Sequence, residues 1–212
     1  MKIIALSCSP SRGRNSDTML DNFILGMKDI PDMEVEKIYL DDIPIDMYTF
    51  ENSKAPLPHE VEFAELARKI TSDATGLVIA TPTYNFSVPA HLKNFIDRIR
   101  FFALDFTQKT KLGQPQGKLE HLKTYFLVSG GTPRWAETLL FFSFPAFWLR
   151  GVFLYFNAKV MGALYSGDIK TYENKKILAK CRKQGRIYAR KVKLCKNHGI
   201  LENIFFRPPQ IR

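Results

Sequence analysis

The chain has 212 residues, 45% of them hydrophobic and 25% charged, which is the balance of a globular domain of ordinary size and excludes a disordered chain. Its three cysteines form no CxxC pair and no metal-ligand spacing, so we expect no cysteine-ligated metal and reduced thiols in the cytoplasm. The net charge is +10, and eleven Lys or Arg residues fall between Lys170 and Lys196. Because no RNA- or DNA-binding motif accompanies them, we expect a solvated basic helix face and no nucleic-acid partner.

Hydrophobic periodicity predicts strands and helices that alternate along the whole chain. The predicted strands cover residues 2–8, 35–40, 76–81, 124–129 and 160–165. The predicted helices cover residues 16–28 and 61–70, a stretch that begins at Pro89, residues 135–149 and residues 171–196. Two polar stretches, 41–58 and 109–120, are expected to be irregular loops. A strand pattern begins directly after Lys2, so no signal peptide is expected.

This alternation predicts an α/β fold: a doubly wound, five-stranded parallel sheet with helices on both faces. We expect one domain over residues 1–197 and a C-terminal tail over residues 198–212. The run 139–156 is very apolar, but Pro145, Arg150 and Gly151 interrupt it, so we expect no membrane span. Its aromatic side chains are more than one helix face buries easily, which leaves a deep core, a subunit interface or a flat aromatic site as their location.

Ligands of open parallel sheets bind beyond the carboxyl ends of the strands. The loop after the first strand, residues 7–16, offers hydroxyls, guanidinium groups and a helix N-terminus, which together suit a phosphate. An ordinary strand–helix turn with a Ser or Asn cap has a similar composition, so the loop alone leaves both interpretations open. The loops 81–90 and 129–135 add aromatic faces and paired glycines, which favours a ligand with a phosphate at one end and a flat ring at the other.

Two of these loops resemble a known family. Ser9-Pro10-Ser11-Arg12, followed by Asn15-Ser16, is similar to the phosphate loop of the NADPH-dependent FMN reductase and quinone reductase family. Residues 81–98 resemble its second signature, Pro-x-Tyr-x-x-x-x-Pro-x-x-Leu-Lys-x-x-Ile-Asp-Arg. The resemblance covers residues 1–170 and implies a flavodoxin-like fold with strand order 2-1-3-4-5 and FMN as cofactor. It also implies hydride transfer from NAD(P)H to a quinone, flavin or other small acceptor, in a homodimer or homotetramer.

Carried over by position, the resemblance implies three groups of cofactor-binding residues and no catalytic side chain. They are Ser9, Ser11, Arg12, Arg14, Asn15 and Ser16 in the first loop, Pro82, Thr83, Tyr84, Asn85 and Phe86 in the second, and Ser129, Gly130 and Gly131 in the third. The chain departs from the family where Ser11 replaces the arginine that usually follows the proline. The related iron–sulfur flavoproteins carry a cysteine cluster that residues 41–58 lack, so no iron–sulfur centre is expected. Asp97 and Arg98 are expected to form surface or interface pairs.

Two other functions stay open at this point. Cys8 and Arg14 have the C-x5-R spacing by which low-molecular-weight tyrosine phosphatases place a thiolate and a phosphate-binding arginine. Asn15 and Pro10 are foreign to that loop, and no Asp-Pro motif supplies a general acid. A flavin-binding electron carrier without turnover is the third interpretation, although flavodoxins are usually acidic and this chain is basic.

Overall fold

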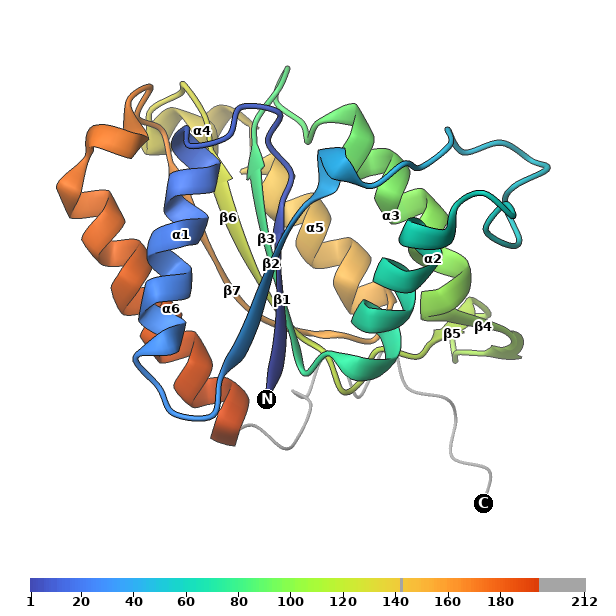
Figure 1. Ribbon diagram of the computed structural model, residues 1–212. Coiled ribbons are helices and arrows are strands. Elements are labelled where there is room, and N and C mark those ends of the chain that lie inside the picture. The colour runs from blue at the N-terminus through green and yellow to red at the C-terminus, as the bar shows by residue number, and fades with distance from the viewer. Residues whose placement is uncertain (142, 195–212) are drawn as a thin grey trace.

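The computed structural model of the chain describes residues 1–141 and 143–194 (Figure 1). Its centre is a five-stranded parallel sheet in the order β2-β1-β3-β6-β7. These strands are β1 (Lys2–Ser7), β2 (Glu34–Tyr39), β3 (Gly76–Pro82), β6 (Lys123–Ser129) and β7 (Lys159–Ser166). When the five parallel strands alone are numbered, the order is 2-1-3-4-5, so the predicted topology is confirmed.

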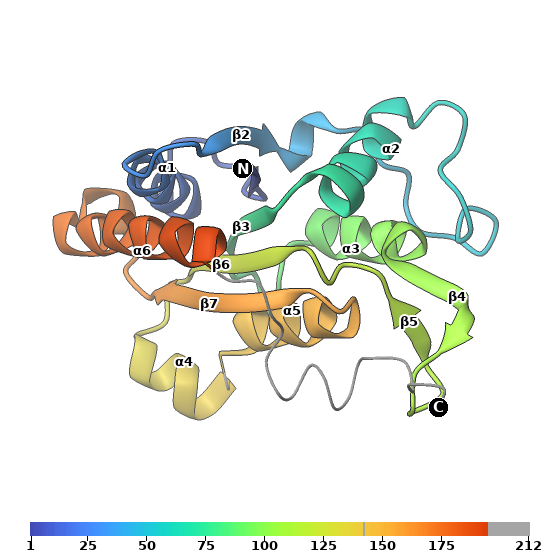
Figure 2. The ribbon, with the colours of Figure 1, turned by 90° about the horizontal axis from the view of Figure 1, so that it is seen from below.

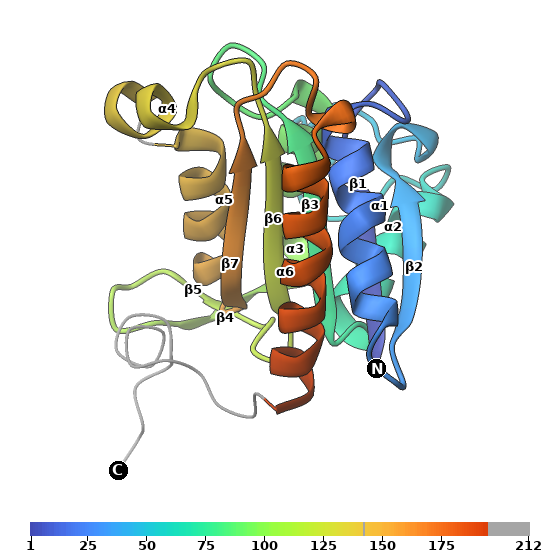
Figure 3. The ribbon, with the colours of Figure 1, turned by 90° about the vertical axis from the view of Figure 1, so that its left-hand side faces the viewer.

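Helices cover both faces of this sheet, as predicted (Figures 2 and 3). The helices are α1 (Asn15–Lys28), α2 (Val61–Arg68), α3 (Ala90–Ala103), α4 (Arg134–Phe141), α5 (Phe144–Tyr155) and α6 (Lys175–Leu194). Helices α1 and α6 form one hydrophobic core with the sheet, and α2, α3 and α5 form another with the opposite face. Strand β3 lies between the two cores, and its residues 77–81 are buried because both faces of the strand are covered.

Two glycines let α1 and α6 pack closely. A Cβ atom added at Gly26 would lie 1.9 Å from the carbonyl oxygen of Arg182, and one added at Gly185 would lie 2.0 Å from that of Phe23. Each helix therefore brings its backbone against a glycine of the other. The buried face of α6 includes Cys181 and Tyr188, as its periodicity predicts.

The structure corrects three predicted boundaries. The region 109–120 is not wholly irregular, because β4 (Leu104–Lys109) and β5 (Pro115–Gly117) form a small antiparallel sheet. The single helix predicted over 135–149 is two helices, α4 and α5, separated at Ser143, which has a left-handed φ of 50°. Pro145 in the first turn of α5 explains the break, because proline has no N–H and its ring would clash with the preceding turn of a continuous helix.

The last predicted helix begins later than expected. Residues 171–173 form a separate 3₁₀ turn, and α6 starts at Lys175. The end of the prediction at 195–196, Cys195 and the tail 198–212 lie outside the described residues. Within the described part of the chain, no helix is both long and apolar enough to cross a bilayer.

Candidate functional site

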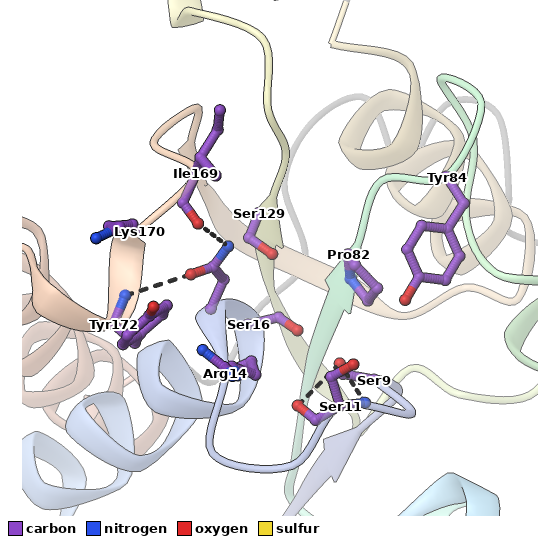
Figure 4. Close-up of a pocket in the computed structure, with 11 residues that line it drawn as sticks. Ser9, Ser11, Arg14, Ser16, Pro82, Tyr84, Ser129, Ile169, Lys170 and Tyr172 are labelled. Carbon is purple, nitrogen blue, oxygen red and sulfur yellow. Dashed lines mark hydrogen bonds between the residues drawn. The ribbon is translucent and has the colours of Figure 1, made fainter.

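A cavity of about 430 Å³ opens at the carboxyl ends of β1, β3 and β6 (Figure 4). Eight of the residues that the sequence predicts for the site line it: Ser9, Ser11, Arg14, Asn15, Ser16, Pro82, Tyr84 and Ser129. Three further residues from the segment between β7 and α6 complete the lining: Ile169, Lys170 and Tyr172. The cavity thus joins the first and second loops, as expected, to a part of the chain that no motif indicated.

The first turn of α1 borders the cavity beside the first loop. Ser16 is 1% exposed, and among the described residues its hydroxyl has no hydrogen-bond partner. A buried hydroxyl without a partner costs free energy, which a ligand oxygen in the cavity would recover. Nearby, the Ser9 hydroxyl accepts a hydrogen bond from the Ser11 N–H at 3.2 Å. The loop therefore presents hydroxyls and the positive end of a helix dipole to the same space.

Asp17 fixes the shape of the first loop from beneath. Its buried carboxylate accepts hydrogen bonds from the Gly13 N–H at 2.7 Å and the Ser7 hydroxyl at 2.8 Å, and pairs with Lys37 at 2.8 Å. Burial alone raises the pKa of Asp17, but the hydrogen bonds from Lys37, Gly13 and Ser7 hold it below its ordinary value. Asp17 therefore stays ionised at neutral pH and holds Gly13 in its left-handed turn, with φ of 68°. Sequence reasoning missed it, because an acidic residue in a first helical turn is ordinary.

Arg12 does not line the cavity. Its guanidinium pairs with the carboxylate of Asp42 and lies 4.2 Å from the centroid of the Tyr39 ring. The displacement of the arginine from the family's usual position thus gives it different partners. The contact between Arg12 and a phosphate stays a prediction, and the cations that line the cavity are Arg14 and Lys170.

The second loop forms a tight hairpin above the cavity. Tyr84 and Ser87 exchange two backbone hydrogen bonds, of 2.9 and 3.0 Å, around Asn85 and Phe86. Both central residues have left-handed φ angles, 48° and 62°, which is the geometry of a type I′ turn. The rings of Tyr84 and Phe86 are 45% and 48% exposed, so the turn presents two aromatic side chains at the edge of the sheet.

The third loop is fixed to both neighbouring strands. The Ser129 carbonyl accepts a hydrogen bond from the Thr83 N–H at 2.7 Å, and the Gly130 N–H donates to Ser166 at 2.8 Å. A Cβ atom at Gly130 would lie 2.5 Å from the Tyr165 hydroxyl, so a larger residue there would displace that hydroxyl from its hydrogen bond to the Thr132 carbonyl. Thr83, Asn85, Phe86, Gly130 and Gly131 are not among the residues that line the cavity, and their contacts with a cofactor stay predictions.

The second signature also anchors the long 43–60 connection. The Asn94 side chain accepts a hydrogen bond from the Tyr48 N–H at 2.8 Å. Arg98 forms a bidentate ion pair with Glu60, and both side chains are fully buried. The expectation of a surface pair at Arg98 is therefore wrong, because its guanidinium faces the core side of α3. Asp97 does pair at the helix surface, with Lys93 one turn earlier.

Cys8 cannot act as the nucleophile of a phosphatase in this arrangement. Its side chain is fully buried in the core beneath α2 and α3, and it does not line the cavity that Arg14 lines. Burial raises the pKa of the Cys8 thiol well above its ordinary value, whereas a nucleophilic cysteine needs a lowered one. The C-x5-R spacing is therefore coincidental.

The sequence profile of the family described as NADPH-dependent FMN reductase matches residues 1–139. The chain belongs to this family. A relative from Mycoplasma pneumoniae, named FMN-dependent NADH:quinone oxidoreductase, is 32% identical over 135 residues, which cover 62% of this chain and 67% of the relative.

Solved structures show the same fold. An azoreductase from Bacillus anthracis has a TM-score of 0.67 at 16% identity, and the match covers 90% of this chain and 99% of that one. A flavodoxin from the domain Archaea has a TM-score of 0.55 at 17% identity over 91% of this chain and 99% of its own. The fold is therefore flavodoxin-like.

Proposed function

We propose that this protein is an FMN-dependent oxidoreductase that passes hydride from NAD(P)H to a quinone or another small aromatic acceptor. The observation that carries the proposal is the cavity at the carboxyl edge of the sheet, with hydroxyls and a cation at one end and an aromatic side chain at the other. The family to which the chain belongs, and the names of its relatives, support the same reaction.

The residues fit the phosphate of such a cofactor. The unpartnered, buried Ser16 hydroxyl, the Ser9 and Ser11 hydroxyls and the N-terminus of α1 are suited to bind phosphate oxygens. Arg14 adds a positive charge on the same cavity. Asp17 does not contact the cavity, and it acts by holding the loop in shape.

The ring end of the cavity is formed by Pro82, Tyr84 and Ser129. Bound FMN supplies the hydride chemistry, so the protein needs to hold the ring and leave one of its faces open to the second substrate. The half-exposed ring of Tyr84 offers a stacking surface, and the Ser129 side chain offers a hydroxyl to a polar ring edge. No side-chain acid or base is required in this scheme.

We also propose that the protein forms a homodimer through α4 and α5. Trp135, Leu139 and Phe147 are 70%, 70% and 67% exposed, although Leu149 and Phe153 of α5 are buried. Exposed apolar side chains of this size favour a subunit interface over a deep core. Analytical ultracentrifugation, which gives the mass of the protein in solution, tests this proposal. We expect a dimer for the wild-type protein and a monomer for Trp135→Glu.

The direct test of the reaction is an absorption spectrum after FMN is added and unbound flavin removed. We expect retained flavin bands that NADH or NADPH bleaches without oxygen and that a quinone restores. Sustained NAD(P)H oxidation with added quinone distinguishes an enzyme from an electron carrier, which would be reduced without turning over. A protein that stays colourless after reconstitution would contradict the proposal.

A further inference from the structure

The segment between β7 and α6 is the part of the cavity that no family motif assigns. Its residues Ile169, Lys170 and Tyr172 line the cavity. In the sequence, Tyr172 lies 157 residues after Asn15 of the first loop. Figure 4 shows the three residues on the same side of the cavity as Arg14. The segment reaches this place because β7 ends at the carboxyl edge of the sheet and α6 packs beside α1.

The Asn15 side chain holds this segment against the first loop (Figure 4). Its Nδ2 atom donates a hydrogen bond to the Ile169 carbonyl at 2.9 Å, and its Oδ1 atom accepts one from the Tyr172 N–H at 3.3 Å. Both polar atoms of the amide are thus bonded to the protein backbone. We therefore assign Asn15 as a positioning residue that holds the segment against the first loop.

The segment also has internal hydrogen bonds that give it a defined shape. The Asp168 carboxylate accepts hydrogen bonds from the Lys170 N–H at 3.0 Å and from the Asn174 side chain at 2.8 Å. The Thr171 hydroxyl lies 2.7 Å from that of Ser166, and both residues are buried. Lys170 is therefore presented from a structured turn.

Two cations line the cavity where the segment borders the first loop, Arg14 and Lys170. The Arg14 guanidinium lies 5.1 Å from the centroid of the Tyr172 ring, which restricts where its charge sits. The Lys170 ammonium is 3.6 Å from the Glu173 carboxylate, and the two side chains are 66% and 55% exposed. An exposed pair of this kind is weak, so the ammonium is available to a stronger anion. Arg12, by contrast, does not line the cavity.

We propose that the β7–α6 segment forms a second wall of the phosphate site and that Lys170 contacts the phosphate of the bound flavin nucleotide. This inference rests on the proposed function, because it takes FMN as the ligand. A phosphate monoester carries about −1.5 to −2 charges at neutral pH, and Arg14 together with Lys170 would balance them. Asn15 keeps the two walls at the separation that lets both cations reach one phosphate.

The test compares FMN with riboflavin, which has the same ring and ribityl chain but no phosphate. Dissociation constants are measured by quenching of flavin fluorescence for the wild-type protein and for Lys170→Met. We expect the substitution to weaken FMN binding about fivefold, the effect of a partly exposed charge pair, and to leave riboflavin binding unchanged. Lys176→Met is the matched control, because Lys176 is exposed at the start of α6 and does not line the cavity.

Two further variants separate contact from positioning. Glu173→Gln removes the carboxylate that competes with the phosphate for Lys170. It should therefore tighten FMN binding when Lys170 is present, and have a smaller effect when it is combined with Lys170→Met. Asn15→Ala should weaken FMN binding, and Lys170→Met should then add little, because the lysine acts only from the held segment.

The outcomes distinguish this inference from the proposed function. If the wild-type protein binds neither FMN nor riboflavin, the proposed function fails. If it binds both and Lys170→Met changes both affinities equally or neither of them, the flavin site stands and the role of Lys170 is refuted. The affinity of the wild-type protein for FMN should also fall more steeply with salt than that of Lys170→Met, because one screened charge pair is missing from the variant.

Discussion

Replacement of Glu60 by glutamine should cause a large loss of stability, because it leaves a buried arginine without its counter-charge. Glu60 accepts hydrogen bonds from two nitrogens of Arg98, and also from the Asp46 N–H at 3.0 Å and the Leu57 N–H at 2.6 Å. An amide of the same shape keeps one acceptor oxygen and turns an NH₂ group toward these donors. Each carboxylate oxygen of Glu60 accepts one hydrogen bond from Arg98 and one from a backbone N–H. The substitution therefore removes the charge of the ion pair and the two hydrogen bonds that the replaced oxygen accepts.

Removal of one partner from a buried ion pair costs about 3–5 kcal/mol. Domains of this size are stable by about 5–15 kcal/mol, so Glu60→Gln should remove a large part of the total. Asp97→Asn is the matched control, because Asp97 pairs with Lys93 on the same helix where both side chains are partly exposed. An exposed helical pair of this spacing contributes about 0.3–0.5 kcal/mol.

The measurement is urea unfolding of the three proteins, with the free energy of unfolding taken from the midpoint and slope. Burial alone raises the pKa of Glu60, but hydrogen bonds from Arg98 and two backbone N–H groups hold it below its ordinary value of 4.5. A carboxyl whose pKa is lower in the folded than in the unfolded state stabilises fully above that ordinary value and loses its contribution as the pH falls below it. The difference between wild type and Glu60→Gln should therefore narrow below pH 4.5. Equal unfolding free energies for Glu60→Gln and Asp97→Asn at neutral pH would refute the reasoning.

Three further predictions concern packing, the loop and the thiol. Gly185→Ala should lower the free energy of unfolding by about 1–3 kcal/mol, because the added Cβ overpacks against the backbone of Phe23. Gly151→Ala is the control and should not lower it, because nothing lies within 4 Å of a Cβ added there. Thermal melts of the two variants and of the wild-type protein measure the difference. Asp17→Asn should weaken FMN binding, because the loop loses the carboxylate that accepts the hydrogen bond from the Gly13 N–H. Asp21→Asn is the control and should change FMN binding little, because Asp21 also pairs with Lys37 but is more exposed. An equal effect of both substitutions in a fluorescence titration would contradict this prediction. Cys8→Ser should keep NAD(P)H oxidation if it folds, and a folded, FMN-loaded variant without turnover would contradict the assignment of Cys8 to the core.

The sequence predicts the fold closely because the strands of a covered parallel sheet are continuous apolar runs. Gly76 to Thr81 is such a run, and α1 repeats apolar residues at the spacing of a single face. The prediction is wrong where two elements share one apolar stretch. Residues 135–149 are apolar on both sides of Ser143, so periodicity continues across a break that Pro145 decides.

The candidate site is predictable where a motif is local, and it is not where the residues meet only through the fold. Ser9 follows β1, Ser16 lies in the first turn of α1, and Pro82 and Ser129 are the last residues of β3 and β6. The structure brings the four residues together on one cavity. Lys170 comes shortly after the fifth predicted strand, and this position at the carboxyl edge of the sheet could have indicated a place near the site. No local pattern, however, distinguishes Lys170 from the other basic residues that follow it. Arg12 pairs with Asp42, 30 residues away along the chain, and Arg98 pairs with Glu60, 38 residues away. Local composition does not reveal pairs that only the fold brings together.

The turn at Asn85 and Phe86 has a consequence for protein engineering. A two-residue turn of this geometry favours glycine at its second position, and a bulky residue there costs about 1–2 kcal/mol. A thermostability design would therefore choose Phe86→Gly and would delete a half-exposed ring from the turn that carries Tyr84. If Phe86 contacts the ligand, as the family resemblance implies, a variant stabilised by Phe86→Gly should also bind its substrate more weakly.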